Sequence, residues 1–392
     1  MEYLNVRQAA LAWGVSPRYV QRLLSDGRIQ GAQKYGRAWM IPAHAEKPPD
    51  PRRERGLPSC AASPYLSCVL LSAVVPMPAH DPEAALATLP NEAQRAQYRA
   101  ELAYLRGDFE AVKTYFTGVS PQDAAYLCAA NITVCAAMCT RDYPLFRHIC
   151  AAVKEIELNA ASPAARLSAS LLPVLAAVSM NAPELAPRWL INGDLWDFAP
   201  DARPMLVYMR VKYLQSIGDH SGMLAAAQTA LALLKRKSGV TLTDVYLTCL
   251  CACGCYALGR ADEAREYLAR SVALCEKGGF VSPLGEYTTW VGGYLETALK
   301  NADPEFERAV NRHIEGTLKN WLFFHNEFAK DKATLILTTK EYQLALLLKE
   351  GKTYAQAAEQ LCISVGRVKN LISIIYQKLG VSKKAEIARH LF

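Results

Sequence analysis

Residues 337–392 constrain the fold more than any other stretch, because signals that begin and end helices follow one another there at short intervals. Thr338 with Glu341 and Thr353 with Gln356 are capping-box patterns, and each such pattern begins a helix. Gly351 stands between them, where a left-handed C-cap ends the first helix. The segment is therefore predicted to be a compact bundle of short helices.

The third of these helices has two distinct faces. Ser364 is its expected N-cap, and Gly380 is expected to end it. Apolar residues recur at three- and four-residue spacing and predict an inward stripe of Val368, Leu371, Ile372, Ile375 and Leu379. The opposite face carries residues suited to phosphate pairing and to hydrogen bonds with base edges, namely Arg367, Lys369, Asn370, Ser373, Gln377 and Lys378. A short fourth helix is expected after Ser382.

This segment resembles the LuxR-type, or GerE-type, C-terminal four-helix DNA-binding domain. The resemblance lies in Leu-Thr-Thr-Lys-Glu at 337–341, Ile-Ser at 363–364, Val-Lys-Asn at 368–370 and Ile-Tyr-Gln-Lys-Leu-Gly-Val at 375–381. In that family the third helix enters the major groove, which implies DNA contacts for Lys369 and Asn370.

The segment departs from the family at Arg367 and Leu371, where Thr and His are usual, and at 356–357, where Gln-Ala replaces Glu-Ile. These changes bear on the DNA sequence preference more than on the fold. The alternative interpretation is a helical bundle whose basic face is merely solvated.

A second helix-turn-helix pattern occupies residues 1–42. Asn5 with Gln8 is a capping-box variant that begins one helix, and Ser16 followed by Pro17 begins another. In the second helix an inward set of Val20, Leu23 and Leu24 alternates with an outward set of Arg18, Tyr19, Gln21 and Arg22. Residues 29–33 and 37–41 are then expected to form a small β-hairpin, with Lys34 and Arg37 beside its tip.

This N-terminal pattern resembles the winged helix-turn-helix of the excisionase and MerR-like superfamily. It rests on Gly-Val-Ser-Pro-Arg-Tyr-Val at 14–20, on Gly-Arg-Ile at 27–29 and on Gly-Arg-Ala-Trp at 36–39, followed by Ile-Pro at 41–42. The resemblance implies a helix in the major groove and a wing along the phosphate backbone. The residues expected to contact DNA are Ser16, Arg18, Tyr19, Gln21, Arg22, Lys34 and Arg37. The alternative is a small scaffold domain that binds protein.

The distribution of charge agrees with nucleic-acid binding at both ends. Residues 1–56 hold ten Lys and Arg against five Asp and Glu, and residues 335–392 hold nine against four. The intervening residues hold 25 basic and 28 acidic side chains, so the formal net charge of +7 is concentrated at the two ends. Two nucleic-acid readers joined by a nearly neutral body are expected to have this charge pattern.

The middle of the chain is rich in Ala and Leu and helical in pattern, after a linker with several prolines at 45–80. A recurring phrase marks the turn within helix pairs at residues 104–111, 138–145, 216–223 and 257–264. Its spacing is 34 residues from Gly107 to Arg141 and 41 from Gly218 to Gly259. Such a period resembles tetratricopeptide-like α-solenoids, so residues 81–330 are predicted to stack as helical repeats.

Several side chains in this middle region have two interpretations. The aromatic residues Trp189, Trp196, Tyr208, Tyr213, Tyr246 and Trp290 either line a binding groove or pack between repeats. The four cysteines at 249, 251, 253 and 255 cannot converge on one metal, because alternate residues of a helix point about 200° apart. Cys251 and Cys255 share a face, but no further ligand follows at the right spacing, so buried packing is favoured over metal or redox chemistry. The aromatic run at 320–328 is interpreted as a connecting helix docked on the repeats or on the C-terminal domain, and hypothetically as a hinge.

Other function classes are disfavoured by what the sequence lacks. It contains no Walker A motif, no receiver-like βαβ pattern and no arrangement of nucleophile and base, so neither an enzyme nor a cofactor is expected. Its longest apolar run, at 66–78, is shorter than the ~20 residues needed to span a bilayer. Scattered cysteines and the absence of a signal peptide favour a reducing cytoplasm.

The sequence therefore predicts a mainly α, bacterial, cytoplasmic transcriptional regulator with domains at 1–44, 81–330 and 331–392. It is expected to bind double-stranded DNA as a homodimer and to sense an unknown protein, peptide or small-molecule effector at the repeats, without a membrane partner. The alternative is a protein- or peptide-binding adaptor whose terminal domains have lost DNA binding. An architectural protein that bends DNA is a third possibility, which the large middle region disfavours.

Overall fold

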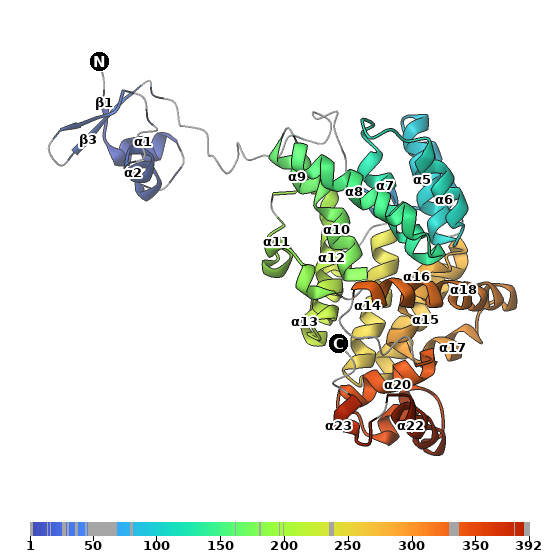
Figure 1. Ribbon diagram of the computed structural model, residues 1–392. Helices are drawn as coiled ribbons and strands as arrows, with labels where there is room; N and C mark the ends of the chain where they lie inside the picture. The colour runs from blue at the N-terminus through green and yellow to red at the C-terminus, as the bar shows by residue number, and fades with distance from the viewer. Residues whose placement is uncertain are drawn as a thin grey trace. The chain divides into compact units, whose positions relative to one another are not determined.

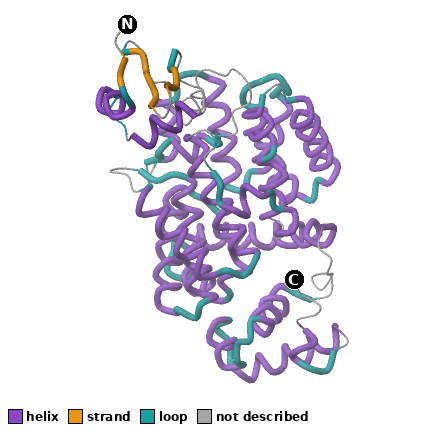
Figure 2. The backbone as a smooth tube through the Cα atoms, turned by 90° about the vertical axis from the view of Figure 1, so that its left-hand side faces the viewer, coloured by secondary structure: helices purple, strands orange, loops and turns teal. Residues whose placement is uncertain are grey.

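The computed structural model describes residues 3–45 except 14, 16, 26–28, 30, 36–37 and 44, residues 69–328 except 79–80, 161, 180–181, 196, 199 and 235–238, and residues 337–387 except 380. The chain is mainly helical with a small N-terminal sheet, as the sequence predicts (Figures 1 and 2). It divides into two compact units, residues 1–59 and residues 60–392.

The first unit is a pair of short helices with a three-stranded antiparallel sheet in the order β1-β3-β2. Its elements are β1 (Tyr3–Leu4), α1 (Val6–Ala12), α2 (Pro17–Ser25), β2 (Gln33–Tyr35) and β3 (Ala38–Pro42). The predicted hairpin is confirmed, with Lys34 opposite Trp39. Its first strand begins at Gln33 and not at residue 29, because the chain makes a turn from Ile29 to Ala32. The two-residue β1 was missed, since so short a strand has no alternation to detect.

Local signals in the first unit form as expected. The Asn5 N–H donates to Gln8 Oε1 over 2.9 Å and the Gln8 N–H donates to Asn5 Oδ1 over 3.0 Å, which completes a reciprocal cap at the start of α1. The apolar faces of α1 and α2 meet the sheet in one small core, whose buried members are Ala9, Ala10, Val20, Leu23, Leu24, Ile29 and Ile41. The inward set of α2 is therefore confirmed.

The second unit begins with a helical body. Its longer helices are α5 (Glu92–Leu105), α6 (Phe109–Thr117), α7 (Tyr126–Thr140), α8 (Tyr143–Asn159), α10 (Leu171–Ser179), α12 (Arg203–Ser216), α13 (His220–Leu233), α14 (Leu242–Ala257), α15 (Ala261–Gly278), α16 (Ser282–Val291) and α18 (Pro304–Phe328). Shorter ones are α4 (Leu71–Val74), α9 (Pro163–Ala169), α11 (Arg188–Asn192), α17 (Gly293–Leu299) and the 3-10 helices η1 (Pro82–Thr88), η2 (Pro183–Leu185) and η3 (Pro200–Ala202). Helical-repeat character is evident in the successive pairs α5–α6, α7–α8, α12–α13 and α14–α15, whose members contact each other.

The recurring phrase in the sequence is the turn inside these pairs. Each turn places one residue in the left-handed region, namely Gly107, Arg141, Gly218 and Gly259, with φ of +78°, +58°, +76° and +74°. The next residue is the N-cap of the second helix. Asp108, Asp142 and Asp219 cap through the side chain, accepting from the backbone N–H three residues later at 3.1, 3.2 and 2.9 Å. The recurring phrase therefore specifies a left-handed residue that ends the first helix of a pair, followed directly by the N-cap of the second.

Residues 69–78 belong to the helical body, although the sequence placed them in the linker. The buried Glu101 of α5 accepts from the backbone N–H groups of Leu71 and Ser72 at 3.0 and 2.6 Å. Further along, Met77 pairs with Val240 in an isolated antiparallel bridge. The proline content that indicated a linker does not distinguish a free chain from a segment that is bound to the body by hydrogen bonds from far along the chain.

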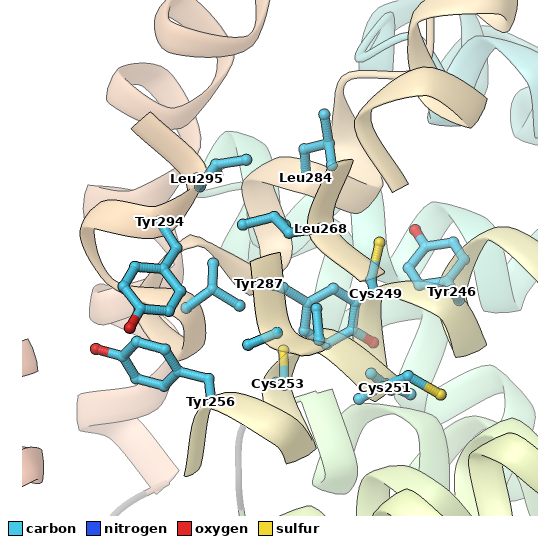
Figure 3. Packing of buried hydrophobic residues seen from close by; sticks show 14 of the residues in the cluster. Tyr246, Cys249, Cys251, Cys253, Tyr256, Leu268, Leu284, Tyr287, Tyr294 and Leu295 are labelled. Atoms are coloured by element: carbon cyan, nitrogen blue, oxygen red, sulfur yellow. The ribbon is translucent and has the colours of Figure 1, made fainter. Parts of the chain in front are cut away.

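Helices α7 and α14 form the centre of the body because they are buried on every side. A helix that is apolar all round fits only inside a layer of other helices. Cys249, Cys251 and Cys253 of α14 lie among leucine and tyrosine side chains, and their sulfur atoms do not converge on one point (Figure 3). Burial raises the pKa of Cys249 and of Cys251 to about 12, so both thiols stay protonated at neutral pH.

The aromatic run at the end of α18 docks on the repeats. Phe324 is fully buried, with its ring centroid 5.0 Å from that of Phe146 and 5.7 Å from that of Tyr143 on α8. Of the two docking positions that the sequence left open, the structure shows the one on the body. In the part of the chain that the structure describes, no helix combines the length and the apolar character needed to cross a bilayer.

The turn at Arg141 yields a stability prediction. A non-glycine residue in the left-handed region costs roughly 1–2 kcal/mol, and the other three turns of this kind avoid that cost with glycine. Arg141→Gly is expected to raise the free energy of unfolding by up to about 1 kcal/mol, measured by chemical denaturation, since the more flexible unfolded chain offsets part of the relief. The matched control is Arg308→Gly inside α18, which is expected to lower it by about 1 kcal/mol. Equal losses in both variants would contradict the explanation.

Candidate DNA-binding surfaces

The C-terminal end of the second unit is a group of short helices, α20 (Thr339–Lys349), α21 (Tyr354–Gln360), α22 (Val365–Leu379) and α23 (Lys384–Ile387). Both predicted capping boxes form. The Thr338 N–H donates to Glu341 Oε2 over 2.7 Å, and the Thr353 N–H donates to Gln356 Oε1 over 2.9 Å. The positions where α20 and α21 begin are therefore fixed locally, by residues three positions apart.

Two left-handed residues set the angles between these helices. Gly351 has φ of +84° and ends α20, as expected. Cys362 has φ of +53° in the tight turn between α21 and α22, a conformation that residues other than glycine rarely adopt. Ser364 then caps α22, its Oγ accepting from the Arg367 N–H over 3.2 Å. The result is a helix-turn-helix in which α22 is the longer, outer helix.

Helix α22 turns a polar and basic face to solvent. Its predicted inward residues Val368, Leu371, Ile372 and Ile375 are buried, and Leu379 is half-buried. Ser364 and the outward residues Arg367, Lys369, Asn370 and Ser373 are all exposed. Gln377 lies in the helix, but its side chain is outside the described ones. A helix face with these side chains suits contact with phosphates and base edges in a major groove.

Two features of this face were not predicted. Val365 and Ile374 are apolar yet 40% and 37% exposed, and apolar side chains on a reading helix can contact thymine methyl groups. Ile374 directly precedes the inward Ile375 and has no place in the inward stripe. This extra apolar residue is the sequence signal that could have predicted an exposed apolar side chain on the face.

Lys378, assigned from sequence to the DNA-facing side, points back into the domain. Its Nζ donates to Glu341 Oε2 over 2.7 Å, and Glu341 is buried. Burial alone raises the pKa of Glu341, but the bonds from Lys378 and Thr338 outweigh it, so the pKa lies below its ordinary value. The correction follows from tertiary structure: the helical period places Lys378 at the edge of the face, and the partner comes from α20.

The inner side of the C-terminal domain packs on the helical body. Side chains of the domain donate to backbone carbonyls of the body: Gln343 to Thr288 (3.0 Å), Gln360 to Tyr256 (2.9 Å) and Lys352 to Ala257 (2.8 Å). The last carbonyls of a helix lack partners within it, and a cation near them is favoured by the helix dipole. Backbone N–H groups of the turn after α14 close most of its C-terminal end, and the domain adds donors to the carbonyls of Tyr256 and Ala257.

Apolar contacts join the same two surfaces. Ala357 and Leu361 of the domain belong to one continuous core with Tyr256 and Tyr294 of the body. The two tyrosine rings meet edge to face at 5.3 Å, close to the end of α14 (Figure 3). One core is thus shared by the domain that carries α22 and by the repeats.

The backbones of the body and of the C-terminal domain come close together at Gly292, which follows α16, and at Gly293, the first residue of α17. A Cβ on Gly293 would overlap the carbonyl oxygen of Leu361 and lie 2.8 Å from its carbonyl carbon. Gly292 has φ of +54°, and a Cβ there would lie 2.8 Å from the Gln360 carbonyl oxygen. The backbone turn that leads from α21 into α22 therefore rests on a pair of residues without side chains.

The residues predicted to contact DNA in the first unit are only partly brought together. Arg18, Gln21 and Arg22 are exposed on one side of α2, whereas Tyr19 is half-buried and packs against the small core. The Arg22 guanidinium lies 5.8 Å from the Tyr19 ring centroid, and Lys34 Nζ lies 5.7 Å from that of Trp39. Tyr19 and Trp39 therefore act as supports for cations and not as free outward side chains. Ser16 and Arg37 lie outside the described residues.

Comparison with known proteins agrees with the geometry of the C-terminal domain. Residues 335–391 match the family model described as bacterial regulatory proteins, luxR family. This segment is a luxR-type helix-turn-helix domain, which confirms the resemblance expected from its sequence. The excisionase- or MerR-like and tetratricopeptide-like resemblances remain predictions.

Curated proteins named as HTH-type transcriptional regulators match part of the chain at low identity. The HTH-type transcriptional regulator MalT of Cronobacter sakazakii (strain ATCC BAA-894) is 27% identical over 148 residues, which cover 34% of this chain and 16% of that protein. MalT of Klebsiella pneumoniae (strain 342) is 27% identical over 149 residues, with the same two shares of 34% and 16%. The chain thus matches 16% of the length of these relatives. No solved structure is significantly similar to it.

The ion pair between Lys378 and Glu341 predicts a pH dependence. The folded pKa of Glu341 lies below its ordinary value of 4.5, so the stabilisation is complete above about pH 4.5 and is lost as the pH falls through the folded pKa. Lys378→Met is expected to lower the free energy of unfolding by about 1–2 kcal/mol at pH 7. The difference from the wild type should shrink below pH 4.5 in acid titrations of chemical unfolding.

The control for this change is Lys383→Met, which removes an exposed lysine of the same domain. It is expected to give no difference that follows the titration of Glu341. A Lys378→Met difference that stays constant between pH 7 and about pH 3.5 would show that the ion pair does not hold Glu341 ionised.

The contact at Gly292 and Gly293 predicts how the packing of the C-terminal domain on the body can be weakened without a mutation in α22. Gly293→Ala forces the Leu361 carbonyl away and is expected to lower the free energy of unfolding by about 1–3 kcal/mol. It should also accelerate amide hydrogen exchange in α20 and α21. Gly316→Ala in α18 is the matched control, because a Cβ added there would have no atom within 4 Å. Unchanged exchange in Gly293→Ala would contradict the observed packing.

Proposed function

We propose that the protein is a DNA-binding transcriptional regulator that reads double-stranded DNA with α22. The observation that supports this most directly is the exposed face of Arg367, Lys369, Asn370 and Ser373, on a domain of luxR type. The domain uses α20 and α21 to contact the helical body and leaves that face open. The chain is therefore arranged to hold its DNA-reading helix without covering it.

Phosphate pairing is assigned to Arg367 and Lys369, and base-edge hydrogen bonds to Asn370 and Ser373. Cations on the face neutralise phosphates and release counterions, so affinity is expected to fall steeply with salt. Ser364 lies at the N-terminus of α22, where backbone N–H groups attract phosphate. A homodimer would place two copies of α22 about one helical turn of DNA apart, which specifies a pair of half-sites.

A second reader is proposed in the first unit. Arg18, Gln21 and Arg22 share the exposed side of α2, the helix that begins at the Pro17 start signal. Lys34 lies on the hairpin that follows α2 and is exposed. A basic helix with a basic wing is the pattern expected of a winged helix-turn-helix, so this unit is proposed to bind DNA independently of α22.

Regulation is proposed to come from the helical body as the sensor of an effector. The shared core and the hydrogen bonds to the end of α14 make the position of the C-terminal domain depend on the body. An effector can shift the DNA-bound population only if it binds the two arrangements with different affinities. The relatives are named as HTH-type transcriptional regulators, which agrees with a regulatory function.

DNA binding through α22 is tested by Lys369→Ala and Arg367→Ala. Each is expected to weaken binding about fivefold or more and to reduce the slope of log affinity against log salt by about one. Fluorescence anisotropy with fragments from genome-wide binding-site mapping provides the measurement, over a salt series. Lys300→Ala removes the same charge from the helical body and is expected to leave affinity unchanged.

The same assay separates the alternatives. An adaptor with no DNA-binding ends gives no anisotropy change with any fragment. Equal losses of DNA affinity in Lys300→Ala and Lys369→Ala would show that DNA is attracted by the net charge of the protein and is not bound specifically by α22. Arg18→Ala and Arg22→Ala are expected to weaken binding in addition to Lys369→Ala, and no additional loss would remove the first unit as a second reader.

A further inference from the structure

The helical body encloses a cavity of about 130 Å³ that none of the proposed DNA contacts uses. Its walls come from α5, α7, α10, α12, α14, α16 and α18 and from the strap at 70–73. Most of the lining is apolar, as at Ile132, Met138, Leu175 and Met205. A cavity of this size is comparable to one of ~150 Å³ known to accept benzene, so it suits a ligand with a compact apolar body.

One carboxylate in the wall has an open oxygen. Glu286 of α16 is half-buried and lines the cavity, and its Oε1 accepts from the hydroxyls of Tyr104 and Tyr246, both at 2.8 Å. Among the described residues, nothing donates a hydrogen bond to the other oxygen, Oε2. A carboxylate oxygen that is partly removed from water without a donor is costly, so this oxygen is a strong acceptor for a donor supplied from inside the cavity.

Other charged groups in the wall do not satisfy it. Glu101 is already held by backbone N–H groups and by Gln97 over 2.8 Å. Lys212 donates to Gln215 over 3.0 Å and lies over the Tyr287 ring at 5.0 Å, and no ion pair with Glu286 forms within the described structure. Burial lowers the pKa of His313 to about 4, so it is neutral at pH 7. Burial raises the pKa of Glu286, whereas the hydroxyls of Tyr246 and Tyr104 and the charge of Lys212 lower it, and no side chain in the described structure pairs with its second oxygen.

Asn131 provides a second unpaired polar group. It is 1% exposed, lines the cavity from α7, and neither its carboxamide oxygen nor its nitrogen has a hydrogen-bond partner in the described part of the molecule. Buried amides are almost always paired in proteins, and an unpaired one marks the place of an absent partner. The carboxamide of Asn131, the carboxylate of Glu286 and apolar side chains thus line the same small cavity.

From this arrangement we propose that the cavity binds a small primary amine with an apolar body, Glu286 serving as its counter-ion and Asn131 as a hydrogen-bond partner. The inference rests on the proposed function, since it identifies the effector class of the regulator. A carboxylate ligand is disfavoured because it would meet Glu286. A plain hydrocarbon leaves Glu286 and Asn131 unpaired.

Helix α16 links the cavity to the DNA-reading domain. Glu286 and Thr289 face the cavity, while the Thr288 carbonyl in the same turn accepts the hydrogen bond from Gln343 of α20. A ligand ammonium that pulls on Glu286 therefore acts within one residue or two of the docking contact. This is a short physical route from the effector to the domain that carries α22.

Isothermal titration calorimetry on the full chain tests the site with ligands of nearly equal size. 2-Phenylethylamine is expected to bind at least about tenfold more tightly than 2-phenylethanol, with no detectable binding of phenylacetate. Glu286→Gln is expected to lower the affinity for the amine about tenfold or more and to leave that for the alcohol unchanged. Glu266→Gln, an exposed glutamate on α15, is the matched control and should change neither.

Several results would overturn the proposal. These are tighter binding of phenylacetate than of the amine, no binding of 2-phenylethylamine up to about 10 mM, or an unchanged amine affinity in a folded Glu286→Gln protein. If that variant does not fold, the ranking of the three ligands on the wild type decides. Adding the amine to the DNA anisotropy assay keeps the two proposals apart: amine binding without any DNA binding refutes the regulator and leaves the site, and the reverse refutes only the site.

Discussion

The contact between the C-terminal domain and the end of α14 is the interaction on which the arrangement of the second unit depends. Helix α14 is buried on every side, and backbone N–H groups of the turn that follows it bind most of its last carbonyls. Lys352 of the domain donates to the Ala257 carbonyl, Gln360 donates to that of Tyr256, and the domain shares the apolar core around Tyr256 and Tyr294. The body without the domain would therefore lose these two hydrogen bonds and expose an apolar surface. The DNA-reading domain is part of the fold of the repeats, not an appendage on a tether.

Features fixed by neighbouring residues could be predicted from the sequence. The capping boxes at Thr338 and Thr353, the inward stripe of α22 and the turns at Gly107, Arg141, Gly218 and Gly259 all depend on residues within one or two helical turns. For the same reason Arg367, Lys369, Asn370 and Ser373 of the exposed face of α22 could be predicted from the helical period. Such signals locate helices and their faces whatever lies beside them.

Features that need a partner from far along the chain could not be predicted. Lys378 reads as a DNA-facing cation until Glu341 of α20 is placed beside it. Residues 69–78 read as linker until Glu101 binds their backbone, and Gly293 has no pattern that announces its contact with Leu361. The cavity depends on side chains from eight helices, α4 among them. Of the aromatic residues with two interpretations, Tyr208 and Tyr246 line that cavity, a choice that composition does not make.

The strap at 69–78 has a mechanical consequence. It is the first described segment after the N-terminal unit, and Glu101 grips the backbone of Leu71 and Ser72 while Met77 bridges to Val240. Leu70, Ser72 and Ala73 are also wall residues of the cavity. If the N-terminal unit binds DNA as proposed, tension along the chain reaches this strap, and with it the cavity wall, before it reaches the rest of the core. Force on the N-terminal unit would then act on the same cavity in which regulation of the C-terminal domain is proposed to begin.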